Sequence, residues 1–281
     1  MRIAIISDDD FGFSNALRKA NHIVSSHECD SLPSLFNDIH NGYKPDCIFL
    51  MDNGEVPASL WRKDNVKDKG LNPTLVYFTR ESLEISESDS KKIKSSDLVL
   101  TQNNHWITNL AFNKSNIFRF PYWVDTNIFS PNDSPKQYDC VSSTKNLELA
   151  DKLKSTFLAK GLTFFNDTNG GPDFLNSGRV FLNFEENFVV PRVFFEASAC
   201  GLPILSVPLH EYSVIESLFE EEREILYFLS LDECLNRAYL YSRFEDQRRS
   251  LAKKSFYLIK NYHTIEKRIR LFIKEIKTLR S

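Results

Sequence analysis

The sequence has few of the residues on which several large protein classes depend. It contains 9 glycines and 5 cysteines in 281 residues, and the cysteines are dispersed, with no C-x-x-C pair. Such a set favours neither a disulfide framework nor a zinc site, so we expect reduced, mostly buried thiols. The glycines form no G-x-G-x-x-G or G-x-x-x-x-G-K-[ST], which excludes a dinucleotide fingerprint and a P-loop kinase. No G-x-S-x-G elbow occurs, so a serine hydrolase is disfavoured.

Long apolar runs are also missing. No run approaches the roughly 18 residues of a membrane-spanning helix. The first ten residues, MRIAIISDDD, hold only a short apolar run before three aspartates, unlike a signal peptide. The hydrophobic content of 42% and the 23 phenylalanines indicate a large buried core. We therefore expect a globular, cytoplasmic protein without a transmembrane segment.

The net charge of −3 hides an asymmetry along the chain. Residues 246–281 carry eleven Lys and Arg against three Asp and Glu, and the rest carries 24 basic and 35 acidic residues. A basic terminal segment on an acidic body suggests contact with a polyanion, such as DNA or an anionic glycan, or peripheral contact with an anionic membrane. A solvated helix face is the alternative.

Buried strands alternate with helical stretches along the whole sequence. Helices are expected at 14–20, with Ser14 as the N-cap, at 32–40 and at 145–160, while 81–95 is an exposed helix or a loop. This alternation predicts two Rossmann-like, doubly wound parallel-sheet domains. The strands are expected at 2–7, 21–25, 44–52, 74–78, 98–102, 116–122, 138–142, 162–166, 180–184, from 204 and at 224–229.

A cluster of Pro, Asn, Asp and Ser over 121–135 is typical of a linker. It predicts an N-terminal domain of residues 1–123, a linker of 124–136 and a second domain of 137–260. Residues 261–281 then form a basic amphipathic helix. Its apolar face needs a partner and comprises Ile265, Ile269, Phe272, Ile276 and Leu279.

The stretch 187–206, NFVVPRVFFEASACGLPILS, predicts a loop, a helix, a turn and a buried strand. Pro191 suits the first helical position, and Gly201 suits the residue after the C-cap. Arg192 and Glu196 are four residues apart and share a face near the N-terminus, where phosphate is attracted. A cation for a diphosphate and a carboxylate for ribose hydroxyls would suit a nucleotide-sugar site. A surface salt bridge explains the same spacing.

The segment PRVFFEASACGLPILS resembles the R-x-F-E-A-x-A-x-G-x-P signature of retaining, two-domain (GT-B type) glycosyltransferases of group 1, and especially the CgeB-like branch. Lys44-Pro45-Asp46, the segment 121–131 and Tyr262-His263-Thr264 resemble further parts of that pattern. The resemblance implies two domains facing a cleft and a hexosyl transfer from a nucleotide-diphosphate sugar, with a UDP-sugar favoured. It implies no cofactor and no dedicated metal.

The resemblance also suggests roles for particular residues. Glu196 would contact the donor ribose, and Arg192, seconded by Lys145, would stabilise the departing diphosphate. Further donor contacts would come from Asn183 and Glu186, after a predicted strand, and from Gly12, although a plain turn explains that glycine equally well.

Three further features bear on the chemistry. His105 follows a predicted strand and is a candidate acceptor-side base, with a structural histidine as the alternative. The run Asp8-Asp9-Asp10 could ligate a cation, but a polar loop is the simpler interpretation. The family pattern has a Glu eight positions before the ribose Glu, where this chain has Phe188. That departure leaves open a transfer-inactive binding or scaffold protein.

Overall fold

The computed structural model describes residues 1–7, 12–29, 35, 39, 42–52, 56–61, 72–79, 85–102, 107, 116–213 and 215–280. It divides into two compact units, Met1–Pro121 with Ile265–Ser281 (unit 1) and Tyr122–Thr264 (unit 2). Each unit carries its own sheet and is described by itself.

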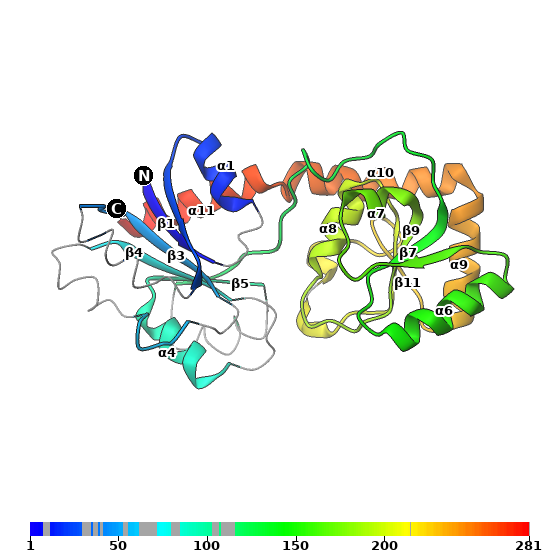
Figure 1. Cartoon of the computed structure of the whole chain (residues 1–281), viewed down its shortest axis with the longest axis horizontal. Helices are drawn as coiled ribbons and strands as arrows, with labels where there is room; N and C mark the ends of the chain where they lie inside the picture. The colour runs from blue at the N-terminus through cyan, green and yellow to red at the C-terminus, as the bar shows by residue number, and fades with distance from the viewer. Residues whose placement is uncertain are drawn as a thin grey trace. The chain divides into compact units, whose positions relative to one another are not determined.

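Unit 1 contains a six-stranded parallel sheet with the order β2-β1-β3-β4-β5-β6 (Figure 1). Its strands are β1 (Arg2–Ile6), β2 (Ile23–His27), β3 (Cys47–Asp52), β4 (Thr74–Thr79), β5 (Leu98–Thr101) and β6 (Ile117–Arg119). The near-continuous apolar composition of the central strands suits a sheet that is covered on both faces.

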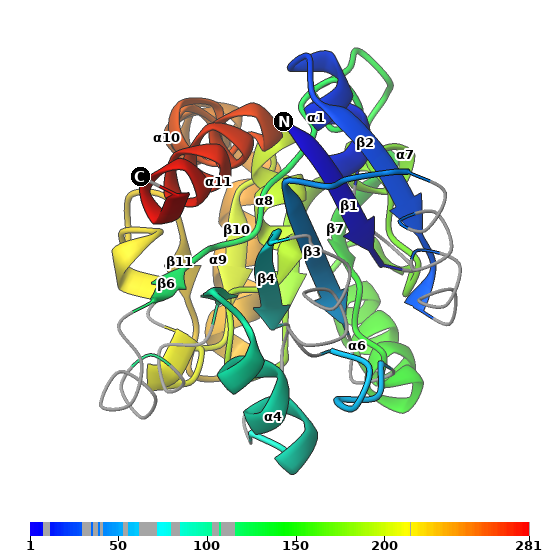
Figure 2. The same cartoon turned by 90° about the vertical axis from the view of Figure 1, so that its left-hand side faces the viewer.

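Alternate residues of the central strands point to opposite faces of this sheet. Phe49 of β3 packs against Phe272 of α11 (Ile265–Arg280), with ring centroids 4.7 Å apart. Phe272 also contacts Phe13 of α1 (Phe13–Lys19) at 5.4 Å. On the other face, Leu50 shares a core with Ile93 of α4 (Glu87–Ser95). Thus α1 and α11 cover one face and α4 the other (Figure 2).

Unit 2 contains a five-stranded parallel sheet with the order β11-β10-β9-β7-β8. Its strands are β7 (Tyr138–Ser142), β8 (Phe164–Asn166), β9 (Gly178–Asn183), β10 (Ile204–Ser206) and β11 (Leu226–Tyr227). In register, Ser142 pairs with Leu182 and Asn183 with Ser206, so the carboxyl ends of β7, β9 and β10 align at one edge. Open parallel sheets bind ligands at this edge.

Five helices pack around that sheet. Leu153 and Phe157 of α6 (Leu147–Ala159) share a core with Leu235 of α9 (Leu231–Arg243) and Leu182 of β9. On the other face, Phe194 of α8 contacts Phe181 of β9 at 6.3 Å. The remaining elements are α7 (Pro172–Ser177), α8 (Arg192–Ala199), α10 (Glu245–Tyr262) and two short 3-10 turns, η2 (Glu211–Ser213) and η3 (Ile215–Ser217).

The predicted α/β fold with two parallel sheets is confirmed, while several local predictions are wrong. Gly12, with φ 79°, is the N-cap of α1, and Ser14 is a buried helical residue whose hydroxyl lies 2.8 Å from that of Ser26. Pro191 is the N-cap of α8 rather than its first residue, because its ψ of 142° is extended. Leu279 is 37% exposed and so leaves the buried face of α11. Most of the helix predicted at 32–40 lies outside the described residues.

The terminal helices divide differently from the sequence-based limits. The helix predicted from 261 includes the end of α10, which belongs to unit 2, and α11, which belongs to unit 1. The helices break at His263 and Thr264, where the His263 carbonyl accepts a hydrogen bond from the Val124 amide at 3.1 Å. Residues 124–136 and 261–264 group with unit 2 by their contacts.

The five cysteines are free and buried, as predicted. Burial raises the pKa of the Cys200 and Cys234 thiols to about 12, so both stay protonated at neutral pH. In the part of the chain that the structure describes, no helix has the length and apolar character needed to cross a bilayer.

Candidate functional site

Helix α8 begins the site because it follows β9 and therefore starts near the carboxyl edge of the sheet. No side chain caps the N-terminus of α8, and the dipole of a helix attracts anions to this end. Its other end is closed: Gly201, at φ 73°, lets the Leu202 amide donate to the Ala197 carbonyl at 2.9 Å. The Gly201 amide donates to Ser198 O at 3.0 Å, which completes a Schellman motif. The helix thus has one closed end and one end suited to a phosphate.

Arg192 and Glu196 form the ion pair that their spacing predicts. Nε of Arg192 lies 2.7 Å from Oε1 of Glu196. The Glu196 side chain is only 11% exposed, whereas the Arg192 side chain is 31% exposed. The carboxylate is therefore a buried group rather than part of a surface pair. A guanidinium carries five N–H donors and can hydrogen-bond to several groups at once.

A carboxylate that the sequence analysis did not select fixes the loop after β7. Oε1 of Glu185 accepts a hydrogen bond from the Thr144 hydroxyl at 3.0 Å and from the Lys145 amide at 3.2 Å. Asn146 then caps α6 by accepting from the Leu149 amide at 3.0 Å. Glu185 lies two residues beyond the end of β9, at the ligand-binding edge of the sheet, but the exposed Glu186 follows the same strand end and shares that signal.

Asn183 holds the same edge together from within. Its Nδ2 donates to the Glu185 carbonyl at 2.8 Å and to the Ser206 hydroxyl at 2.9 Å. The Asn187 side chain donates to the same Glu185 carbonyl at 3.1 Å. The Asn183 amide thus ties the ends of β9 and β10 to the segment that leads to α8.

Two polar atoms at this edge are buried without a hydrogen-bond partner. They are the hydroxyl of Ser142, the last residue of β7, and Oδ1 of Asn166, the last residue of β8. These two residues are in register, and Nδ2 of Asn166 donates to the Thr144 carbonyl at 3.0 Å. Buried polar atoms are almost always paired in native proteins, so this edge can bind a further polar group.

We expect Glu185→Ala to destabilise unit 2 by about 1–2 kcal/mol, because the Thr144 hydroxyl and the Lys145 amide lose a charged acceptor. Urea unfolding followed by circular dichroism measures the change. Glu186→Ala is the matched control, since Glu186 is exposed and adjacent in sequence. Equal effects of the two substitutions would contradict the role of Glu185.

The other predicted site residues are placed as follows. The Lys145 and Glu186 residues are exposed near the ends of β7 and β9. Gly12 belongs to unit 1, where it follows β1 and caps α1. Phe188 packs against the His210 ring, with centroids 4.6 Å apart. His105 and Asp8-Asp9-Asp10 lie outside the residues that the structure describes. Among the described residues, no group of three His, Cys, Asp or Glu side chains could hold a metal ion.

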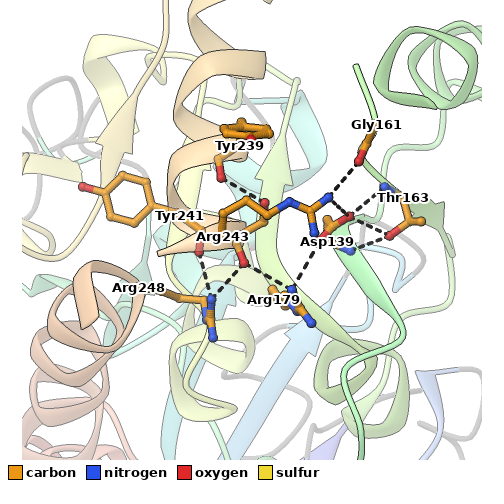
Figure 3. A network of polar contacts seen from close by, with 9 residues as sticks. Asp139, Gly161, Thr163, Arg179, Tyr239, Tyr241, Arg243 and Arg248 are labelled. Carbon is orange, nitrogen blue, oxygen red and sulfur yellow. Dashed lines mark hydrogen bonds and ion pairs between the residues drawn. The ribbon is translucent and has the colours of Figure 1, made fainter. Parts of the chain in front are cut away.

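The opposite edge of the unit 2 sheet holds a polar network centred on Asp139 (Figure 3). Its buried carboxylate accepts hydrogen bonds from the Thr163 amide and hydroxyl, and it lies 3.5 Å from Arg179 and from Arg243. Arg248 donates to the Ser242 carbonyl at 3.0 Å, near the C-terminus of α9. The network joins α9 and α10 to the sheet at the edge away from the N-terminus of α8, so it is structural.

Comparison with known proteins adds three findings. Residues 166–274 match a family model described as glycosyl transferase-like. No curated protein matches the chain. Solved structures match nearly its whole length. Sucrose-phosphate synthase from Thermosynechococcus elongatus has a TM-score of 0.70 at 12% identity, and 99% of each chain is covered.

Two further solved structures cover the chain to the same extent. A glycosyltransferase from Rickettsia africae has a TM-score of 0.69 at 10% identity and covers 99% of this chain and 98% of its own. Anabaena HepE in complex with UDP and glucose has a TM-score of 0.68 at 11% identity and covers 99% of this chain and all of its own. Residues 166–274, which match the family model, include β9 with Asn183 and α8 with Arg192 and Glu196. The chain therefore has the two-domain fold of the GT-B glycosyltransferases.

Proposed function

We propose that the protein is a retaining glycosyltransferase that moves a hexose from a UDP-sugar to an acceptor hydroxyl. The observation that carries this proposal is the Arg192–Glu196 pair in the first turns of α8, at the carboxyl edge of the unit 2 sheet. It combines a cation, a helix N-terminus without a side-chain cap and a buried carboxylate. The glycosyl transferase-like match over 166–274 includes this helix.

The proposed chemistry follows from where charge develops. The bond between the sugar C1 and the diphosphate oxygen breaks, and its electron pair stays on the diphosphate. Arg192, Lys145 and the amides at the start of α8 would stabilise that charge, and preorganised electrostatic stabilisation of this kind usually contributes most to the rate enhancement. The acceptor oxygen forms the new bond to C1 on the same face, and its proton passes to the departing diphosphate or to a base, for which His105 is the candidate.

Donor recognition would use the remaining residues of the site. Glu196 would accept hydrogen bonds from the ribose hydroxyls, and the exposed Glu186 would contact the sugar. Asn183 and Gly12 remain predicted donor contacts, although the Asn183 amide is already bonded to Glu185 and Ser206. UDP is favoured because structures of HepE contain UDP and UDP-glucose.

Cations on the protein make a metal unnecessary in this scheme, so we propose metal-independent transfer without a cofactor. The acceptor class remains a glycan, a protein or modified DNA. We also propose a cytoplasmic location, which the five free thiols support because disulfides are rare there.

A thermal-shift panel of UDP-, GDP-, ADP- and CMP-sugars tests the proposal. A ligand that binds only the folded state raises the melting temperature, and we expect UDP-sugars alone to do so, equally with EDTA and with Mg²⁺. Incubation of the responding donor with water as the acceptor should then release the free sugar slowly. Proton NMR of the first-formed anomer reports retention. A shift with no nucleotide sugar would contradict the donor site.

A transfer-inactive binding protein is the second candidate, because Phe188 occupies the position where the family pattern has its first Glu. The Phe188 ring packs against His210 and offers no carboxylate to the sugar. The same panel separates the two functions: a scaffold would bind a donor without hydrolysing it.

A further inference from the structure

The outer face of α11 carries a row of positively charged side chains, which we call the α11 row. It consists of Lys267, Arg270, Lys274 and Lys277, all exposed. Their spacing of three, four and three residues places them on one face, and the row is about 15 Å long. In Figure 2 this helix is drawn in red and ends at the C-terminus.

The opposite face of α11 fixes the row to the core of unit 1. Ile269, Phe272 and Ile276 are buried, and the Phe272 ring contacts Phe13 and Phe49. The helix therefore cannot turn its apolar side outward without opening this core. Any partner of the α11 row meets a rigid line of positive charge.

These four cations are not neutralised by the described part of the chain. None of them forms an ion pair there, and only Glu266 and Glu275 on the same helix carry negative charge. Several exposed or half-buried basic residues on other helices do pair within one turn. Examples are Lys91 with Glu87, Arg237 with Glu233 and Arg249 with Glu245. What distinguishes α11 is that its four unpaired cations follow one another along a single face.

A hollow of about 440 Å³ lies at the C-terminal end of the row, lined by Met1, Asp46, Lys277 and Arg280. Asp46 engages Arg280, whose Nη1 lies 3.3 Å from the carboxylate and donates to the Asp46 carbonyl at 3.1 Å. Lys277 has no such partner among the described residues. A phosphate group would find an uncompensated ammonium and a guanidinium here.

An apolar residue lies beside the hollow. Ile23 is 63% exposed, and its amide donates to the Met1 carbonyl at 3.0 Å. A large apolar side chain next to cations suits the boundary between headgroups and acyl chains, whereas a nucleic acid offers it no matching surface. A membrane is therefore the better partner for this combination.

We propose that the α11 row, the adjoining hollow and Ile23 form a docking surface for an anionic phospholipid membrane. The row contacts headgroup phosphates, Lys277 and Arg280 hold one phosphate in the hollow, and Ile23 enters the interface. The chain outside α11 carries 29 basic and 36 acidic residues and is repelled by such a membrane, so this face is oriented toward it. The surface does not depend on the proposed transferase activity.

Sedimentation of the full chain with vesicles tests this surface. We expect binding to phosphatidylcholine vesicles that contain phosphatidylglycerol, loss of binding at high salt, and none to pure phosphatidylcholine. Each cation near an anionic leaflet strengthens binding about fivefold, so K267E/R270E/K274E should weaken it at least 100-fold. Equal binding to both vesicle types would overturn the proposal.

The matched control is K152E/K154E/K160E on and beside α6. It makes the same charge change at exposed positions that form no single row. We expect the control to bind anionic vesicles as the wild type does, and both triple variants to keep the wild-type unfolding transition. A control that loses as much binding as the α11 variant would show that net charge alone is responsible. Tighter binding to duplex DNA than to anionic vesicles would assign the surface to nucleic acid instead.

Discussion

Arg192→Ala is expected to lower kcat/KM for the UDP-sugar by about 10²–10³-fold, as the loss of one preorganised charge at a developing oxyanion does. The same change leaves Glu196 as a buried carboxylate without this guanidinium, so some loss of stability accompanies it. Arg192→Lys retains a positive charge but not the planar fork, and it should recover only part of the activity. Steady-state kinetics over a range of donor concentrations measures these effects.

Glu196→Gln separates the two members of the pair. It keeps the shape and one acceptor oxygen but removes the charge, so we expect a higher KM for the donor with a smaller fall in kcat. Arg249→Ala is the control, because Arg249 forms an ion pair of the same i,i+4 spacing with Glu245 on α10, where both side chains are more than half exposed. Wild-type kinetics in Arg192→Ala and Glu196→Gln would contradict the site.

The sequence predicted the fold well because its main signals are local. Apolar runs such as RIAII and CIFLMD can be satisfied only in strands that are covered on both sides, and each became a central strand. Capping was predicted less well. Serine is a common N-cap residue, so Ser14 was predicted to cap the helix. The helix instead begins at Phe13, because Gly12, two residues before Ser14, adopts a positive φ and is the N-cap. Leu279 has the spacing of the apolar face of α11, yet its side chain is exposed because the buried contacts of that face end before this last turn.

Contacts within one helix of the site could be predicted from the sequence, whereas contacts between residues on different strands could not. Arg192 and Glu196 are four residues apart, so their pairing could be read from the sequence. Glu185 acts on a loop that is 40 residues earlier in the chain, through the adjacency of β7 and β9. Strand order is a property of the tertiary fold, so the sequence could not distinguish Glu185 from the neighbouring, exposed Glu186.

Asp139→Ala is expected to destabilise unit 2 by about 3 kcal/mol, because the buried carboxylate accepts two hydrogen bonds from Thr163 and pairs with the half-buried Arg179 and the exposed Arg243, and all of these interactions are lost. Arg179 and Arg243 each lie 3.5 Å from this one carboxylate, and burial together with the charge of Arg179 lowers the pKa of the nearby Arg248. The carboxylate also accepts the Thr163 amide at 3.0 Å, which would lose its acceptor. The corresponding fall in melting temperature is about 10 °C.

Asp139→Asn distinguishes charge from hydrogen bonding within this network. An amide oxygen can still accept from Thr163, so the loss of stability that remains in Asp139→Asn measures what the negative charge contributes against the arginines. Asp151→Asn, at an exposed position of α6, is the control and should change stability by less than about 0.5 kcal/mol. Because the network lies at the sheet edge away from the N-terminus of α8, donor affinity of the folded Asp139 variants should match the wild type. A change in donor affinity without a change in stability would contradict a purely structural role for Asp139.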